Sequence, residues 1–305
     1  MKYYITLFIK GIAIGIANVV PGVSGGTIAL ITGIYEELIN SLKSFNIKAL
    51  KLISSFNIKG FIQYTNMYFL LAVFGGSIAS VFSIANLFKY LFANYPISIW
   101  SLFFGLIMAS VYFIGKRIAK WNTVNISMLL IGTIVAISLS FITPASENDN
   151  LFFIFICGFI GVIGMILPGL SGSFLLILMG NYILMLNFID GSFKLETESL
   201  VLLSIFISGS VVGLISCSNI IAWLLKNYKN ILLSVLTGFV LGSLYTIWPW
   251  QKCLTWLDPE KQEKCMKTIR YLPEINNNVI YCILLMILGI VIVWKLENIT
   301  IENKT

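Results

Sequence analysis

The sequence predicts an all-α polytopic membrane protein with an inverted-topology repeat, and three observations support this fold class. The chain is 58% hydrophobic and only 11% charged, which is more apolar than a soluble domain of this length. Its apolar residues fall in successive runs, most of them long enough to cross a bilayer. Two of these runs carry the same proline- and glycine-rich interruption. We therefore expect one integral membrane domain over residues 1–305.

Eight apolar segments follow one another, at 3–42, 66–88, 97–115, 124–142, 151–189, 199–224, 230–248 and 279–294. One membrane helix needs only about 20 residues, whereas Leu151 to Ile189 is 39 residues without Asp, Glu, Lys or Arg. This fifth segment must fold back, and Pro168 to Gly172 lies near its centre. The fold-back predicts either two short crossings or a re-entrant hairpin.

The two interrupted segments mark two copies of one unit. At a constant offset of 147 residues, Pro21, Gly22, Ser24 and Gly25 match Pro168, Gly169, Ser171 and Gly172. After a longer loop at about 43–65 in the first copy the offset becomes 133, and Gly76 and Ser77 match Gly209 and Ser210. We expect a broken hairpin and two membrane helices in each copy. The expected organisation is repeat A at 1–115, a linking helix at 124–142, repeat B at 151–248, an extracytoplasmic loop at 249–278 and a C-terminal helix at 279–295.

A single linking helix makes the second copy enter the membrane from the opposite face, which is the architecture of many secondary transporters. With the N-terminus inside, most Lys and Arg fall in cytoplasmic segments, as the positive-inside rule requires. We expect a multi-pass protein of the bacterial cytoplasmic (inner) membrane with both termini cytoplasmic. Loop 249–278 would then lie outside, where Cys253 and Cys265 could form a disulfide. The first 20 residues show no cleavage site, so we expect them to belong to the fold.

The composition argues against several functions. The chain has no histidine, which removes histidine bases and histidine metal ligands, and no GxxxxGK[ST] loop for ATP. We expect no cofactor and no metal. The net charge of +7 is explained by topology, so no nucleic-acid partner is expected. The six expected membrane helices lack Asp, Glu, Lys and Arg, which argues against a buried charge relay.

The interruptions have the chemistry of an anion site. Pro21 disfavours helix before it, and Ser24 is a good N-cap for the helix that follows. Free N–H groups at such a helix start bind phosphate, and Ser171 would cap the second copy in the same way. The expected substrate-binding residues are Asn18, Pro21, Gly22, Ser24, Gly25, Gly26 and Thr27 in the first copy and Pro168, Gly169, Ser171, Gly172 and Ser173 in the second.

Helix length places Ser24 near the bilayer midplane, and the inverted copy would bring Ser171 to meet it. The alternative is that these small residues only permit close helix packing. For three charged residues the sequence allows two roles each. Lys10 would be an interface residue or a headgroup contact, and Glu36 and Glu37 would be solvated charges or proton-coupling groups.

The stretches "GIANVVPGVSGGTIALITGIYEELI" and "LPGLSGSFLLILMGNY" resemble the PopT family of bacterial polyprenyl-phosphate translocases, formerly a family of unknown function. The resemblance covers nearly the whole chain; loop 249–278 fits it least. It implies a transporter that returns undecaprenyl phosphate or a related lipid carrier to the cytoplasmic leaflet for cell-wall and surface-polysaccharide synthesis. The oligomeric state is not implied.

Two alternatives to this transporter are a small-anion transporter or channel, and a phosphatase. The motif is also similar to that of undecaprenyl-pyrophosphate phosphatase, which would make the protein an enzyme. That chemistry requires an arginine and a carboxylate beside the serine. Gly25 and Gly172 stand where the arginine would be, so we expect no catalytic residues and no enzyme.

Overall fold

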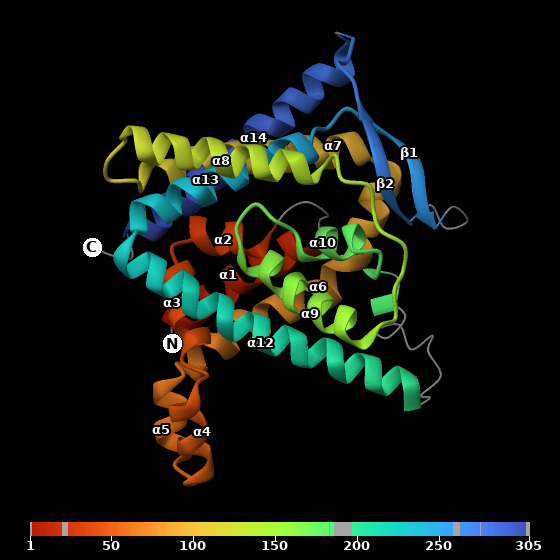
Figure 1. Cartoon of the computed structure of the whole chain (residues 1–305). Coiled ribbons are helices and arrows are strands. Elements are labelled where there is room, and N and C mark those ends of the chain that lie inside the picture. Colours follow the sequence, from red (N-terminus) through yellow and green to blue (C-terminus); the bar gives the residue numbers. More distant parts are fainter. Residues whose placement is uncertain are drawn as a thin grey trace.

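The computed structural model describes residues 2–19, 24–182, 184–185, 197–258, 263–274 and 276–302. This part of the chain is mostly helical (Figure 1). Its elements are α1 (Lys2–Val19), α2 (Gly25–Ile31), α3 (Tyr35–Lys43), α4 (Ile47–Ser54), α5 (Ile58–Tyr64), α6 (Met67–Asn94), α7 (Pro96–Lys116), α8 (Thr123–Leu139), α9 (Leu151–Ile166), α10 (Gly172–Leu178), α12 (Thr197–Asn227), α13 (Lys229–Thr246), β1 (Gln251–Asp258), β2 (Glu263–Arg270) and α14 (Asn277–Glu302).

Several of these helices suit a membrane. Among the described residues, four are long and apolar enough to span one, at Pro96–Lys116, Leu200–Asn227, Lys229–Thr246 and Asn277–Lys295. Helices α5 and α6 would add a fifth span as a bent pair. The predicted multi-pass architecture of apolar helices is therefore confirmed at this level; the chain is mostly helical and not all-helical, because it also contains β1 and β2.

The long helices pack in pairs, α1 with α6, α9 with α12, α7 with α14 and α8 with α13. Glycines allow the close approach. A Cβ atom on Gly76 of α6 would lie 2.1 Å from the Phe8 carbonyl oxygen, and one on Gly209 of α12 would lie 2.1 Å from that of Phe155. Small residues let membrane helices approach to backbone contact. These two contacts match at the offsets seen in the sequence.

Helices α8 and α14 also occupy matching places. Gly105 of α7 packs against the backbone of Met286 in α14, and its counterpart Gly238 of α13 packs against that of Leu129 in α8. Helix α8 follows α7 in the chain but pairs with α13, whereas α14 follows α13 but pairs with α7. Each of these helices thus pairs with the half of the molecule that does not contain the helix before it in the chain, a relation that the sequence did not reveal.

Two segments expected to be loops contain secondary structure. Residues 43–65 hold the short helices α4 and α5, and the expected loop 249–278 holds the antiparallel hairpin β1–β2. The hairpin register places Cys253 opposite Thr268 and Cys265 opposite Trp256. The side chains of both cysteines lie outside the described residues, so their disulfide stays a prediction.

The hydrophobic core joins the two halves around α2. It includes the fully buried side chains of Leu7, Tyr35, Ile107 and Leu236, from α1, α3, α7 and α13. Figure 1 shows α2 and α10 enclosed between the α8–α13 pair and α12. The two short helices that follow the interruptions are therefore central in the molecule.

Candidate functional site

The first break lies between α1 and α2. Pro21 and Gly22 lie outside the described residues, and Ser24 is the extended residue that caps α2, as predicted. The Ser24 hydroxyl accepts a hydrogen bond from the Gly26 amide at 3.2 Å. The Gly25 amide donates to Oδ1 of Asn18 at 2.9 Å, and the Thr27 amide donates to the Ser24 carbonyl at 3.0 Å. The first three amides of α2 are therefore bonded within the protein.

The second break lies between α9 and α10. Pro168 precedes Gly169, which has a φ of +81°, and a Cβ atom there would lie 2.4 Å from the carbonyl carbon of Phe239; only glycine fits both conditions. Ser171 stands at the N-cap position of α10, but the predicted side-chain cap is absent, because its hydroxyl lies 3.0 Å from that of Ser173 instead. Within the described part of the chain, the amides of Gly172 and Ser173 have no hydrogen-bond partner.

The two breaks contact each other directly. The Ser24 hydroxyl donates to the Leu167 carbonyl at 3.0 Å, and the Gly169 amide donates to the Thr27 hydroxyl at 3.0 Å. A Cβ atom on Gly26 would lie 2.4 Å from the Ile166 carbonyl oxygen. The sequence-based expectation that the breaks meet agrees with this geometry. The contact is tight and hydrogen-bonded, so in this conformation no ligand space separates Ser24 from the second break.

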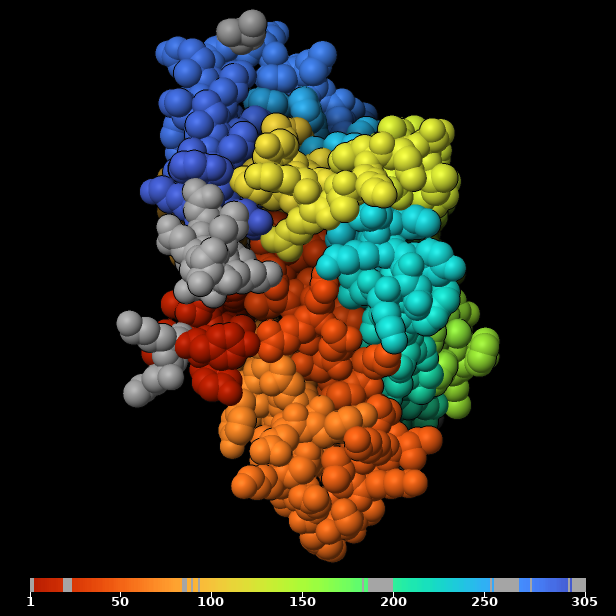
Figure 2. Space-filling view, turned by 90° about the vertical axis from the view of Figure 1, so that its left-hand side faces the viewer, coloured from red at the N-terminus to blue at the C-terminus, as the bar shows by residue number. Residues whose placement is uncertain are grey.

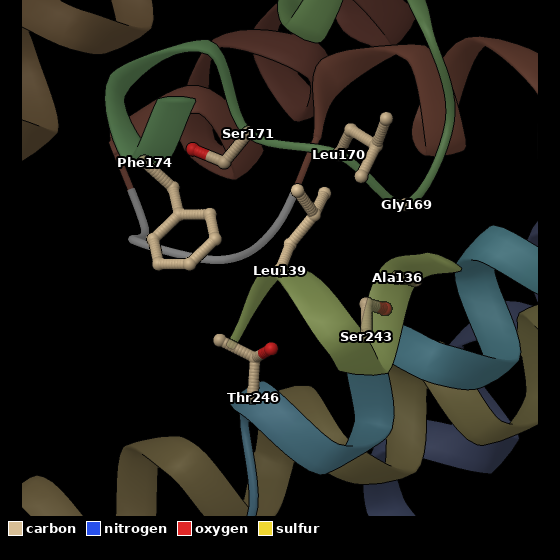
Figure 3. A pocket seen from close by; sticks show the side chains of 8 residues that line it. All are labelled: Ala136, Leu139, Gly169, Leu170, Ser171, Phe174, Ser243 and Thr246. Atoms are coloured by element: carbon tan, nitrogen blue, oxygen red, sulfur yellow. The ribbon is translucent and has the colours of Figure 1, made fainter. Parts of the chain in front are cut away.

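A small pocket lies on the other side of the second break (Figure 3). It is lined by Gly169, Leu170, Ser171 and Phe174 together with Ala136 and Leu139 of α8 and Ser243 and Thr246 of α13. Figure 3 shows the second break facing α8 and α13 across this space. The lining contains hydroxyl groups and no charged side chain. It could therefore hold an anion only through neutral donors.

Two cations hold the C-terminal end of α2. Arg117 donates to the Leu30 and Ile31 carbonyls at 2.6 and 2.8 Å and pairs with Glu297 of α14 at 3.0 Å. The Lys10 ammonium donates to the Thr32 carbonyl at 2.7 Å. Positive charge is favourable at a helix C-terminus. These contacts tie α1, α7 and α14 to the short helix of the first break.

Arg117 and Glu297 were not among the residues predicted from the sequence. Arg117 falls in a basic cluster that the positive-inside rule already explains, and Glu297 lies just beyond the expected end of the last helix at 295. Both side chains are largely buried, with 28% and 12% exposed. The position of Glu297, an acidic residue at the end of an apolar segment, was the one sign in the sequence of a buried ion pair.

The remaining candidate acids lie away from the breaks. Glu36 pairs with Lys229 at 2.6 Å, and both side chains are about half exposed. Glu37 accepts hydrogen bonds from the Tyr3 hydroxyl and the Asn66 amide. None of these partners belongs to either break. In the described ranges, no cluster of three or more Cys, Asp or Glu is arranged to hold a metal ion.

The comparisons with known proteins agree on one family. Residues 14–265 match the family model described as undecaprenyl phosphate translocase-like. A Vibrio cholerae serotype O1 protein named polyprenyl-phosphate transporter is 40% identical over 253 residues, covering 83% of this chain and 80% of that protein. A Staphylococcus aureus protein of the same name is 30% identical over 253 residues, covering 79% and 85%. No solved structure matches. The chain therefore belongs to the undecaprenyl phosphate translocase-like family, as its motifs predicted.

Proposed function

We propose that this protein is a transporter that moves undecaprenyl phosphate, or a related polyprenyl-phosphate carrier, back to the cytoplasmic leaflet. The names of its relatives supply the substrate class. The structural observation that carries the proposal is the second break, where two free amides and two hydroxyls gather at the centre of the molecule. Such donors suit a phosphate. The lipid carrier would then serve cell-envelope polysaccharide synthesis.

The proposed architecture is an inverted-topology repeat with two re-entrant hairpins. Helices α2 and α10 have 7 residues each, or about 10 Å, which is a third of the hydrocarbon thickness. Each ends before a glycine of positive φ, Gly33 and Gly180. Matching positions and matching helix pairs support the repeat. In this arrangement the protein lies in a bacterial inner membrane, and the end of the molecule that carries Lys10, Arg117 and Lys229 faces the cytoplasm.

The phosphate would bind in the pocket beside the second break. Of the proposed donors only Ser171 lines the pocket as it stands; the amides of Gly172 and Ser173 and the Ser173 hydroxyl, in the adjoining first turn of α10, would reach the phosphate oxygens once the pocket opens. The polyprenyl tail would stay in lipid. Because the pocket is small, α8 and α13 must move away from the break to admit the headgroup. Rocking of the two halves about the contact between Ser24 and Leu167 would expose the site to each face in turn.

The proposal excludes phosphate cleavage as the main activity. The sequences of both breaks lack arginine, aspartate and glutamate, and Arg117 is bound to the far end of α2 and to Glu297. Hydrolysis needs charged groups at the phosphate. A site of neutral donors can hold and release a phosphate ester without breaking it.

The test is a Ser171→Leu variant reconstituted in liposomes with a labelled polyprenyl phosphate. We expect translocation to be lost, because leucine fills the pocket and removes a donor. Overpacking at this buried position should lower the free energy of unfolding by about 1–3 kcal/mol, and the variant should still unfold cooperatively in detergent. Ser204→Leu on the exposed face of α12 is the matched control and should transport normally. Normal translocation by Ser171→Leu would overturn the proposed site.

Two further arms test the alternatives from the sequence. Flux of inorganic phosphate without lipid translocation would favour a small-anion transporter, since the same donors suit any small oxyanion. Release of phosphate from a polyprenyl pyrophosphate by the purified protein would favour the phosphatase.

A further inference from the structure

The segment between α3 and α6 is the longer loop of the first copy, and it forms a helical hairpin, α4–α5, that projects from the body of the protein (Figures 1 and 2). Helix α4 contacts α5, and α5 contacts the start of α6. Phe45 packs edge-on against Phe61, and Asn46 hydrogen-bonds to the Tyr64 hydroxyl at 2.9 Å. The hairpin is therefore an organised unit with its own contacts.

The hairpin carries a row of exposed apolar side chains. Ile47, Leu50 and Ile53 lie at helical spacing on α4 and are 73%, 66% and 46% exposed. Phe56 at the tip and Ile58 at the start of α5 are 88% and 56% exposed. Contiguous apolar side chains on a projecting element indicate a surface that contacts a partner or a membrane.

The charge on the hairpin is of one sign. From Leu38 to Leu71 the chain has four lysines, Lys43, Lys48, Lys51 and Lys59, and no Asp or Glu. Lys48 and Lys51 are exposed beside the apolar row of α4. A helix with an apolar face flanked by lysines is typical of elements that lie in the headgroup region of an anionic bilayer.

The direction of the hairpin fits a membrane surface. Helix α5 bends by 67° away from α6, so if α6 crosses the bilayer then α5 lies close to the membrane plane. Three exposed tyrosines lie together near the bend between α5 and α6. The Tyr4 ring packs edge-on against the rings of Tyr3 and of Tyr68, which is at the start of α6. Tyrosines gather where a helix leaves the hydrocarbon.

We propose that the α4–α5 hairpin lies on the cytoplasmic leaflet, with Ile47, Leu50 and Phe56 inserted among the lipids and its lysines bound to anionic headgroups. The leaflet assigned here rests on the orientation given under the proposed function; the lipid contact itself does not depend on transport. An acidic protein surface is the competing partner, and it would leave the apolar row in water until that protein binds.

The experiment uses the full chain in nanodiscs with an environment-sensitive fluorophore on Leu50→Cys, corrected for labelling of the parent protein. Lys120→Cys, on the exposed loop between α7 and α8, is the matched control site. In discs containing phosphatidylglycerol we expect a blue-shifted Leu50→Cys label that is quenched by lipid-borne nitroxide and protected from aqueous iodide. The control label should be quenched by iodide.

Lipid charge separates the two parts of the proposal. Replacing phosphatidylglycerol by phosphatidylcholine, or changing Lys48, Lys51 and Lys59 to glutamine, should increase iodide quenching at position 50. A label at position 50 that stays as accessible to iodide as the control in anionic discs would overturn the proposal. If the label at position 50 is protected from iodide to the same extent in both lipids and with or without the lysine changes, the proposed contact between the lysines and the headgroups would be wrong.

Discussion

The first and second breaks share a sequence pattern but differ in how their amides are used. In the first break, Asn18 occupies the Gly25 amide. At the matching position of the second break stands Met165, whose side chain lies against Gly172 but cannot accept a strong hydrogen bond. The Gly172 amide therefore has no partner among the described residues. The exchange of Asn18 for Met165 thus accounts for the difference between the first amides of the two short helices.

The far ends of the two short helices differ as well. The end of α2 is held by Lys10 and Arg117. The end of α10 is held by neutral groups, since the Ala145 amide donates to the Leu178 carbonyl at 2.9 Å and the buried Asn181 side chain bonds to Asn148. The C-terminal end of α2 is thus bound by charged side chains, and that of α10 by backbone groups of the loop before α9. We infer that the first break is the fixed support and the second break the part that binds.

The largest expected effect comes from separating the breaks. In Gly26→Ala the new methyl group would collide with the Ile166 carbonyl, and overpacking of this kind costs about 1–3 kcal/mol. We expect most translocation to be lost, together with a lower unfolding temperature.

Gly75→Ala on α6 is the control for this change. A Cβ atom there meets only a Phe8 ring atom at 3.9 Å, so transport and stability should stay normal. Parent-like transport by Gly26→Ala would show that the contact between the breaks has no role in function.

The next effect tests the charged fastening of the first copy. Arg117→Ala removes the cap from α2 and leaves Glu297 unpaired, and because the pair is partly exposed we expect a loss of about 2–3 kcal/mol in the free energy of unfolding. Lys116→Ala removes the same charge from an exposed neighbour and should change little. Adding Glu297→Gln to Arg117→Ala should recover part of the loss. A fully additive double variant would contradict the pairing.

A smaller effect is expected from exchanging the residue that distinguishes the breaks. Met165→Asn would give the Gly172 amide the partner that Gly25 has. Phosphate would then compete with a hydrogen bond worth about 0.5–1.5 kcal/mol, so translocation should fall by up to about tenfold. The measurement is the initial rate at limiting lipid phosphate.

Met165→Leu keeps an apolar side chain at this position and serves as the control for Met165→Asn. An unchanged rate in Met165→Asn would mean that the Gly172 amide does not meet the substrate.

The sequence predicted what is local or repeated. The cap at Ser24, the fold-back near Pro168 and the matched glycines follow from residue types at fixed spacing, and the structure contains them. The contrast between Asn18 and Met165 was visible at the same offset. Its consequence for the amides required the geometry of both breaks.

Long-range pairings could not be predicted in this way. Arg117 and Glu297 are 180 residues apart, and each alone is typical of a helix end near water. The pairing of α8 with α13 and of α14 with α7 could be indicated in the sequence only by small residues at the contacts, such as Gly132 and Gly289. Small residues are common in membrane helices, so they do not identify a partner.

The smallest effect is expected at Glu36, which the sequence left open as a coupling group. Its partner Lys229 begins α13, and both side chains are about half exposed, so the pair should contribute no more than about 0.5 kcal/mol. Glu36→Gln should therefore leave translocation and its pH dependence unchanged. Lys229→Gln should behave in the same way, since either change removes the same weak attraction between α3 and α13. If Glu36→Gln alone abolished translocation or shifted its pH profile, the Glu36 carboxylate would bind and release protons during transport. The first copy would then take part in transport and would not be only a support.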